Sequence, residues 1–196
     1  WISARFDWLV TVDPHLHRYD SLDEIYSIPS AVVPAAPALA EWILANVDRP
    51  VIIGPDAESG QWVKAVAGHR NLPWQVMRKD RFGDHDVHIA APDLSGLKQH
   101  TPVLVDDIVS SGATLARGAE VLEAAGLAAR VCAVVHGLFG QGAKDLLAGA
   151  GIERLVCTDS VKVDEGVIEL APLLAPVVNR MIEGNTSAGA STDQEQ

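Results

Sequence analysis

The chain has few cationic residues and few cysteines, and it lacks a long apolar run. Lys and Arg together number 15 against 26 Asp and Glu, so the formal net charge is −11. Because binding to a nucleic acid needs clustered cations that neutralise phosphates, this composition argues against a DNA- or RNA-binding protein. A membrane-spanning helix needs about 18 or more consecutive apolar residues, and the sequence contains no such stretch.

The two cysteines, Cys132 and Cys157, both lie in apolar runs typical of strands. Two thiols are too few for a disulfide framework or a zinc site, so they are expected to be buried in a protein of a reducing compartment. No secretion leader is visible, and the sequence therefore predicts a cytoplasmic protein. The chain begins with Trp1 and enters a strand-like run directly. We therefore expect this sequence to be the carboxy-terminal part of a longer protein.

Short β-branched runs alternate with longer amphipathic stretches. The predicted strands cover 8–13, 50–56, 102–107, 129–136 and 153–159, and the predicted helices cover 36–47, 59–69, 112–126 and 142–151. This alternation predicts an α/β fold in which a parallel β-sheet is flanked by helices on both faces. The polar stretch 77–100 interrupts the rhythm and is expected to be a flexible loop or hairpin. We divide the chain into 1–35, the end of an amino-terminal domain, 36–182, the main domain, and 183–196, a disordered tail.

Polar residues end four of the predicted strands. Asp13, Asp56, the pair Asp106 and Asp107, and His136 all fall at predicted carboxyl ends. In an open parallel sheet these ends line the ligand crevice, so the pattern favours one shared site.

The stretch "PVLVDDIVSSGATL", 102–115, joins an acid pair to a loop of small residues and a helix start. Two carboxylates can accept hydrogen bonds from the cis-hydroxyls of a ribose. The peptide N–H groups of the following loop and the helix N-terminus can hold a phosphate. A pentose 5-phosphate satisfies both parts. The alternative is structural: Asp107 ends a strand and Ser111 caps a helix. The loop residues are Ser110, Ser111, Gly112, Ala113 and Thr114.

Several motifs occur in the order of one family. "VLVDDIVSSGATL" resembles the phosphoribosyl-pyrophosphate loop of the type I phosphoribosyltransferase fold. "LVTVDPHLHR", "IIGPDAESGQWVKAVA" and "MRKDRFGDHDV", together with "VVHGLF" and "RLVCTDSV", resemble segments of ribose-phosphate pyrophosphokinases. The resemblance runs from residue 8 to about residue 182 and corresponds to the carboxy-terminal half of that family.

The resemblance implies transfer of pyrophosphate from ATP to ribose 5-phosphate by a homo-oligomeric enzyme with Mg²⁺ as cofactor. It assigns catalysis to Lys79 and Arg81, and ribose 5-phosphate binding to Asp106, Asp107 and 110–114. Its metal ligands are Asp13, His15 and Asp56, of which His15 also contacts ATP. For Asp56 the structural alternative is an acid that caps a helix.

The chain also departs from the family pattern. Ser110 stands where an acid is common, Ala113 replaces a glycine, and the family's adenine-binding segments have no counterpart, which would leave this fragment inactive. Two other functions stay open: a phosphoribosyltransferase that consumes phosphoribosyl pyrophosphate, and a non-catalytic subunit associated with a synthetase.

Overall fold

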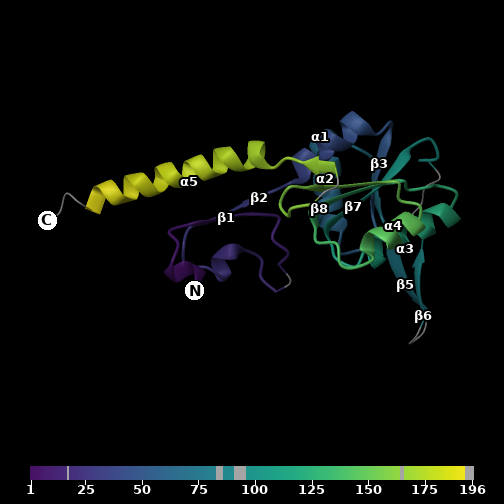
Figure 1. Ribbon diagram of the computed structural model, residues 1–196, viewed down its shortest axis with the longest axis horizontal. Helices are drawn as coiled ribbons and strands as arrows, with labels where there is room; N and C mark the ends of the chain where they lie inside the picture. The colour runs from purple at the N-terminus through teal and green to yellow at the C-terminus, as the bar shows by residue number, and fades with distance from the viewer. Residues whose placement is uncertain (17, 83–85, 91–95, 164–165, 193–196) are drawn as a thin grey trace. The chain divides into compact units, whose positions relative to one another are not determined.

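The computed structural model (Figure 1) describes residues 1–16, 18–82, 86–90, 96–163 and 166–192, with only the backbone at 78–82, 86–90, 166 and 185–192. The chain divides into two compact units. One unit joins Trp1–Ala35 to the segment from Leu170 onward, and the other is Ala36–Glu169. The predicted main domain, 36–182, begins at the same residue as the second unit but extends beyond its end.

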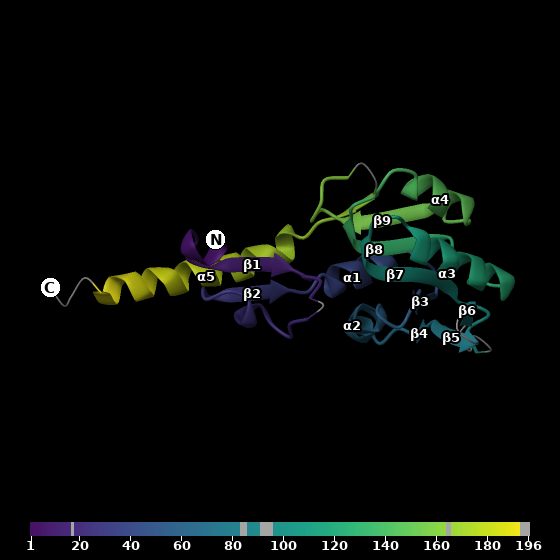
Figure 2. The same ribbon diagram turned by 90° about the horizontal axis from the view of Figure 1, so that it is seen from below.

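The larger unit is built on a six-stranded sheet in which every pair of neighbouring strands is parallel. The strand order is β10-β9-β8-β7-β3-β4, and Figure 2 shows β9, β8, β7, β3 and β4 in this order. This confirms the predicted parallel α/β architecture. The strands are β3 (Pro50–Gly54), β4 (Trp74–Val76), β7 (Thr101–Val109), β8 (Val131–Gly137), β9 (Arg154–Thr158) and β10 (Gly166–Ile168).

Two pairs of helices cover the sheet: α1 (Ala36–Asn46) packs with α2 (Gly60–Arg70), and α3 (Ala113–Ala124) packs with α4 (Ala143–Gly149). From β3 the chain passes through α2 to β4 on one side. From β7 it passes through α3 to β8, and then through α4 to β9, on the other side. Because parallel crossovers are right-handed, these two directions place α2 and the α3–α4 pair on opposite faces. The direction reverses between β3 and β7, so their carboxyl ends form the topological switch point of the sheet.

Strand β7 lies at the centre of the core, because six of its nine residues are buried. Leu104 of β7 packs with Ile53 of β3, Val134 of β8 and Leu122 of α3 in one fully buried cluster. Such continuous apolar runs are typical of parallel strands covered on both faces. Both cysteines are free thiols in this core.

The interrupting stretch forms an antiparallel hairpin of β5 (Arg78–Phe82) and β6 (Asp86–Ala90). Arg78 pairs with Ala90 and Phe82 with Asp86. The expected hairpin is thus present, and β6 contacts α3. Residues 83–85 and 91–95 of this stretch lie outside the described residues.

The smaller unit pairs β1 (Leu9–Val12) with β2 (Ser30–Val33) in parallel and includes the 3-10 turns Ile2–Ala4 and Leu22–Glu24. Its long helix α5 (Ala171–Thr192) runs through most of the tail for which disorder was predicted. The tail sequence has no apolar periodicity to indicate a helix, but a helix that has already formed can extend one hydrogen bond at a time. Residues 193–196 lie outside the described residues. Although α5 spans 22 residues, none of the helices in the described ranges is apolar enough over sufficient length to cross a bilayer.

Gly112 offers a test of the packing around the start of α3. Its φ of 77° lies in the left-handed region, and an added Cβ would be 3.2 Å from both the Ala143 oxygen and Leu147 Cγ. Gly126 has a similar φ of 80°, but a Cβ there would meet nothing within 4 Å. We expect Gly126→Ala to cost about 1 kcal/mol from backbone strain alone. Gly112→Ala should cost about 1–3 kcal/mol more in chemical denaturation, because a clash is added. Equal losses in the two variants would contradict this packing.

Candidate functional site

The carboxyl end of β7 opens into a cavity of about 160 Å³. Asp106 and Ile108 reach it from the strand, and the loop that follows closes it together with the first turn of α3. The structure therefore brings Asp106 and the predicted loop around one space at the switch point. The lining residues are Asp106, Ile108, Val109, Ser110, Ser111, Gly112, Ala113, Thr114 and Leu115.

The loop is held so that backbone N–H groups of the start of α3 belong to the cavity wall. The left-handed Gly112 turns the chain into the helix, and Ser111 Oγ accepts a hydrogen bond from the Ala113 N–H at 3.3 Å. The Ser110 carbonyl accepts one from Gly140 N–H at 2.8 Å, which ties the loop to the segment after β8. Ser111 thus accepts a bond from the first residue of α3, while the N-cap position of the helix is Gly112. Such a turn with a helix N-terminus behind it favours an anion.

Asp106 sits in an unfavourable electrostatic position. The pKa of Asp106 is raised from 3.8 to about 7. Burial is the largest cause, and the neighbouring Asp107 and Asp56 carboxylates also contribute. A hydrogen bond from the Asp107 N–H to Asp106 Oδ1, at 3.1 Å, acts in the opposite direction. Asp107 and Asp56 thus lie close enough to Asp106 to repel its carboxylate. Such repulsion is typical of a site that binds polar or cationic partners.

Asp107 does not line the cavity with Asp106. It is only 3% exposed, and the strand continues regularly through Val109, two residues beyond its predicted end. Adjacent residues of a regular strand face opposite sides of the sheet. Asp106 is therefore the member of the pair that lines the cavity, and the Asp107 carboxyl acts on it as a close neighbour.

The predicted metal ligands belong to both units. Asp56 Oδ1 accepts hydrogen bonds from the N–H groups of Glu58 at 3.0 Å and Ser59 at 3.2 Å, in the turn that precedes α2, whose N-cap is Ser59. Asp13, with a φ of 34°, accepts the Ala35 N–H at 2.8 Å, and His15 is exposed; both belong to the smaller unit. Within the described ranges, no three His, Cys, Asp or Glu side chains gather as a metal site. The metal roles stay predictions.

Lys79 and Arg81 both lie on β5, opposite Ile89 and Val87 of β6. Their side chains are outside the described part of the structure, so their predicted catalytic roles rest on this backbone position. The hairpin belongs to the same unit as the cavity.

Sequence reasoning did not identify Ser160, which follows β9. Its Oγ lies 2.8 Å from Nδ1 of His136, the polar residue at the end of β8. Thr158 Oγ1 donates to the Val135 carbonyl at 2.7 Å and fixes the neighbouring backbone. The polar "TDS" after an apolar strand was the available indication of this network.

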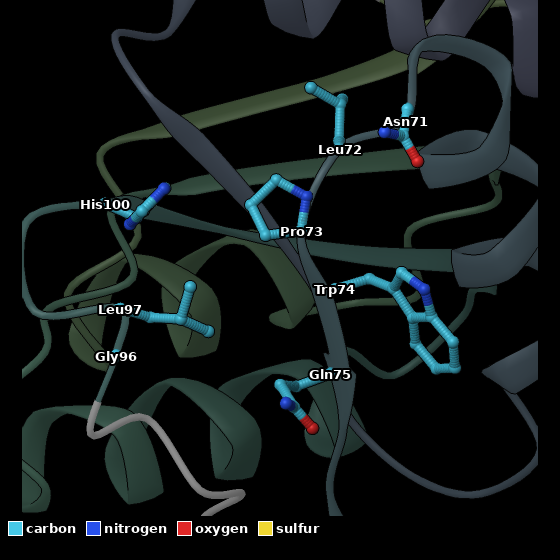
Figure 3. Close-up of a pocket in the computed structure, with 8 residues that line it drawn as sticks. All are labelled: Asn71, Leu72, Pro73, Trp74, Gln75, Gly96, Leu97 and His100. Atoms are coloured by element: carbon cyan, nitrogen blue, oxygen red, sulfur yellow. The ribbon is translucent and has the colours of Figure 1, made fainter.

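A second, larger cavity, of about 690 Å³, lies at the amino end of β4 (Figure 3). His100 Nδ1 is buried there and has no hydrogen-bond partner. No carboxylate is among its described lining residues, and it lies where strands begin, so it does not match the crevice predicted at strand carboxyl ends. Its lining residues are Asn71, Leu72, Pro73, Trp74, Gln75, Gly96, Leu97 and His100.

A parallel sheet with an acid, a small-residue loop and a helix N-terminus at its switch point defines a phosphoribosyltransferase-like fold. The family model described as "Phosphoribosyl transferase domain" matches residues 21–164. The chain belongs to this family.

Individual relatives narrow the resemblance. The chain is 32% identical over 176 residues to a ribose-phosphate pyrophosphokinase of Methanothermobacter thermautotrophicus, covering 90% of this chain and 60% of the relative. It is 32% identical over 174 residues to ribose-phosphate pyrophosphokinase 2 of Archaeoglobus fulgidus, covering 89% and 62%. The crystal structure of phosphoribosylpyrophosphate synthetase from Mycobacterium smegmatis superposes with a TM-score of 0.70 at 25% identity, covering 92% and 60%. The resemblance inferred from the motifs is confirmed, and the chain spans about 60% of the length of these relatives.

The raised pKa of Asp106 predicts a pH-dependent effect of Asp106→Asn on stability. Between pH 4 and 7 the unfolded chain loses this proton while the folded chain keeps it, so the carboxyl destabilises the fold progressively as the pH rises. The neutral Asn avoids this cost. We expect the variant to gain about 1–3 kcal/mol relative to the wild type between pH 4 and pH 8, measured by denaturant unfolding, below a ceiling of about 4 kcal/mol for the full shift.

The control is Asp48→Asn, which removes an exposed carboxylate from the same unit. A difference between Asp106→Asn and the wild type that stays constant over this pH range would mean that Asp106 is not held in a repulsive site.

Proposed function

We propose that this chain is the sugar-phosphate-binding part of a ribose-phosphate pyrophosphokinase, which transfers pyrophosphate from ATP to the anomeric hydroxyl of ribose 5-phosphate. The products are phosphoribosyl pyrophosphate and AMP. The observation that carries the proposal is the single cavity lined by Asp106 and 110–114 at the switch point. The names of the relatives support it.

The cavity offers different chemistry at its two ends. Asp106 supplies a carboxylate that can accept a sugar hydroxyl proton in a hydrogen bond, and the loop supplies peptide N–H groups and hydroxyls for the phosphate. Asp107 is buried behind Asp106 and raises its pKa. Its proposed contribution to ribose binding therefore passes through Asp106.

Pyrophosphoryl transfer is chiefly a matter of aligning reactants and neutralising charge that spreads over phosphate oxygens. Lys79 and Arg81, one residue apart on β5, would supply cations for that purpose. A hairpin that projects from the sheet can close over a bound nucleotide and exclude water. Their position in the unit that contains the cavity supports this role.

Mg²⁺ fits the carboxylate-rich switch point, because Asp56 lies close enough to Asp106 to raise its pKa. Magnesium takes few protein ligands and keeps several waters, so a dense cluster is not required. Asp56 would hold it there, and the family resemblance also assigns metal binding to Asp13 and His15 of the smaller unit, and contact with ATP to His15. When bound, the ion would neutralise the phosphate oxygens of ATP.

We also propose that the protein is cytoplasmic and assembles as a homo-oligomer. The two buried free thiols support a reducing compartment. The family resemblance supports the assembly.

The reaction is tested by incubating the protein encoded by the complete reading frame with ATP, Mg²⁺ and ribose 5-phosphate. AMP formation that depends on ribose 5-phosphate would support the proposal. The description of the matching family model favours a phosphoribosyltransferase as the second candidate. Pyrophosphate release from phosphoribosyl pyrophosphate that depends on a base would establish that alternative. The absence of both activities would favour a non-catalytic subunit.

Lys79→Ala separates catalysis from sugar-phosphate binding. Because Lys79 lies on β5 of the hairpin rather than in the loop 110–114, we expect kcat to fall about 100-fold or more while the Kd for ribose 5-phosphate changes less than about 3-fold. Turnover is measured by AMP formation and binding by calorimetry. Lys98→Ala, at an exposed lysine that follows the same hairpin, is the matched control and should retain turnover. Parallel losses of binding and turnover in Lys79→Ala would refute this division of roles.

A further inference from the structure

The chain leaves β8 through a turn in which an aromatic residue has a strained backbone. Phe139 has a φ of 37°, in the left-handed region that a bulky L-residue rarely adopts. Other non-glycine residues with a positive φ in the described ranges include Asp13 and Asn71, which are of the residue types that tolerate it. An aromatic residue in this conformation therefore needs a specific cause.

The strained turn directs three consecutive peptide N–H groups toward the end of β7. The N–H groups of Leu138 and Phe139 both donate to the Val109 carbonyl, at 3.0 and 3.2 Å. The next N–H group, that of Gly140, donates to the Ser110 carbonyl at 2.8 Å. The turn therefore holds both the last residue of β7 and the first residue of the loop that follows it.

The bond to Ser110 fixes the direction of a peptide group in the loop. A trans peptide is planar, and its C=O and N–H point in opposite directions. Because the Ser110 carbonyl accepts from Gly140, the N–H of Ser111 in the same peptide group points away from the turn. Ser110 and Ser111 both line the cavity. The turn thus sets the orientation of a backbone donor in the wall of the site.

The ring of Phe139 holds the turn in this conformation. An added Cβ on Gly137 would lie 2.5 Å from Cε2 and 3.0 Å from Cζ of the ring, so the ring lies directly on the bare backbone at the end of β8. Phe139 also packs against the buried core cluster that contains Val109 and Cys157. A strained residue persists only where the surrounding structure fixes it, and such residues are concentrated at functional sites. The contacts of the ring therefore offset the backbone strain.

The chain beyond the turn contacts the other end of the loop. The N–H of Ala143, the first residue of α4, donates to the Gly140 carbonyl at 3.0 Å. An added Cβ on Gly112 would lie 3.2 Å from the Ala143 carbonyl oxygen. The segment 137–143 therefore supports the loop both at Ser110 and at Gly112.

We propose that Phe139 is a positioning residue of the sugar-phosphate site. Its ring, seated on Gly137, holds the strained turn whose Gly140 N–H keeps the loop peptides oriented for the phosphate. Phe139 itself does not touch the ligand. The inference rests on the proposed function and assigns part of the affinity for ribose 5-phosphate to a segment outside the loop 110–114.

The test uses the different demands that position 139 places on alanine and glycine. Both variants lose the ring, but only Phe139→Ala keeps the backbone strain, because glycine adopts a positive φ freely. We expect Phe139→Ala to weaken the binding of ribose 5-phosphate about 3- to 10-fold, since the turn relaxes and releases the Ser110 carbonyl. Phe139→Gly should bind at least about 2-fold more tightly than Phe139→Ala. A side chain that only packs in the core would give no such recovery, because glycine removes more packed atoms than alanine.

Binding is measured by calorimetry on the full chain, and denaturant unfolding verifies that each variant is folded under the same conditions. Gly137→Ala supplies a second test that keeps the Phe139 side chain, because its Cβ displaces the ring, and it should weaken binding as Phe139→Ala does. The matched control is Val66→Ala on α2, a truncation of a side chain that is 1% exposed and does not line the cavity. It should lower the free energy of unfolding but keep the Kd within about 2-fold of the wild type.

Three results would overturn the proposal in distinguishable ways. Wild-type affinity in Phe139→Ala or in Gly137→Ala would show that the loop does not depend on the ring, and would leave the proposed function intact. Binding to Phe139→Gly that is as weak as to Phe139→Ala would reduce Phe139 to a packing residue. A wild type that binds no ribose 5-phosphate would overturn the proposed function, and this inference with it.

Discussion

The arrangement of this protein depends on the repulsion among carboxylates at the carboxyl ends of β3 and β7. Asp106 is the residue most affected, with a pKa raised to about 7 by burial and by Asp107 and Asp56. The net free energy of unfolding of a domain is only about 5–15 kcal/mol. The cost of burying Asp106 beside other carboxylates is therefore retained chiefly where a ligand compensates it. The sheet topology explains why these carboxylates lie close together. The crossover direction reverses between β3 and β7, so the connections that leave their carboxyl ends diverge and leave a crevice there. A sugar hydroxyl, a metal ion or a cationic side chain would each relieve the repulsion.

The loop next to Asp106 owes its shape to residues that have almost no side chain. Gly112 takes the left-handed conformation from which α3 starts, and it lies against α4. Gly118 in the next turns of α3 allows that helix to approach the sheet, because a Cβ there would lie 3.2 Å from Pro55 Cβ and 3.4 Å from Leu104 Cδ2. The close approach of α3 to the sheet places the helix N-terminus beside the end of β7. Packing and anion binding are therefore two consequences of the same small residues.

Much of this could be predicted because the evidence for it is local in sequence. Five strands and four helices were recognised from apolar runs and glycine caps, and the parallel sheet followed from their alternation. The elements that were missed, β2, β4, β10 and α5, are short or lack periodicity, so that tertiary contacts rather than local pattern decide them. The site was only partly predictable for the same reason. The end of β7 depends on its pairing with β8 through Val109 and Gly137, and in a strand that continues this far Asp106 lines the cavity while Asp107 is buried.

The central claim is that one crevice binds a sugar phosphate through the Asp106 carboxylate at one end and the peptide N–H groups of 111–114 at the other. A crystal structure of the protein soaked with ribose 5-phosphate tests it most directly. The account predicts phosphate density within hydrogen-bonding distance of those N–H groups and a sugar hydroxyl on Asp106, at about 2.7–3.1 Å. Ligand bound instead in the cavity lined by Trp74 and His100, or an unchanged crevice at saturating ligand, would contradict it.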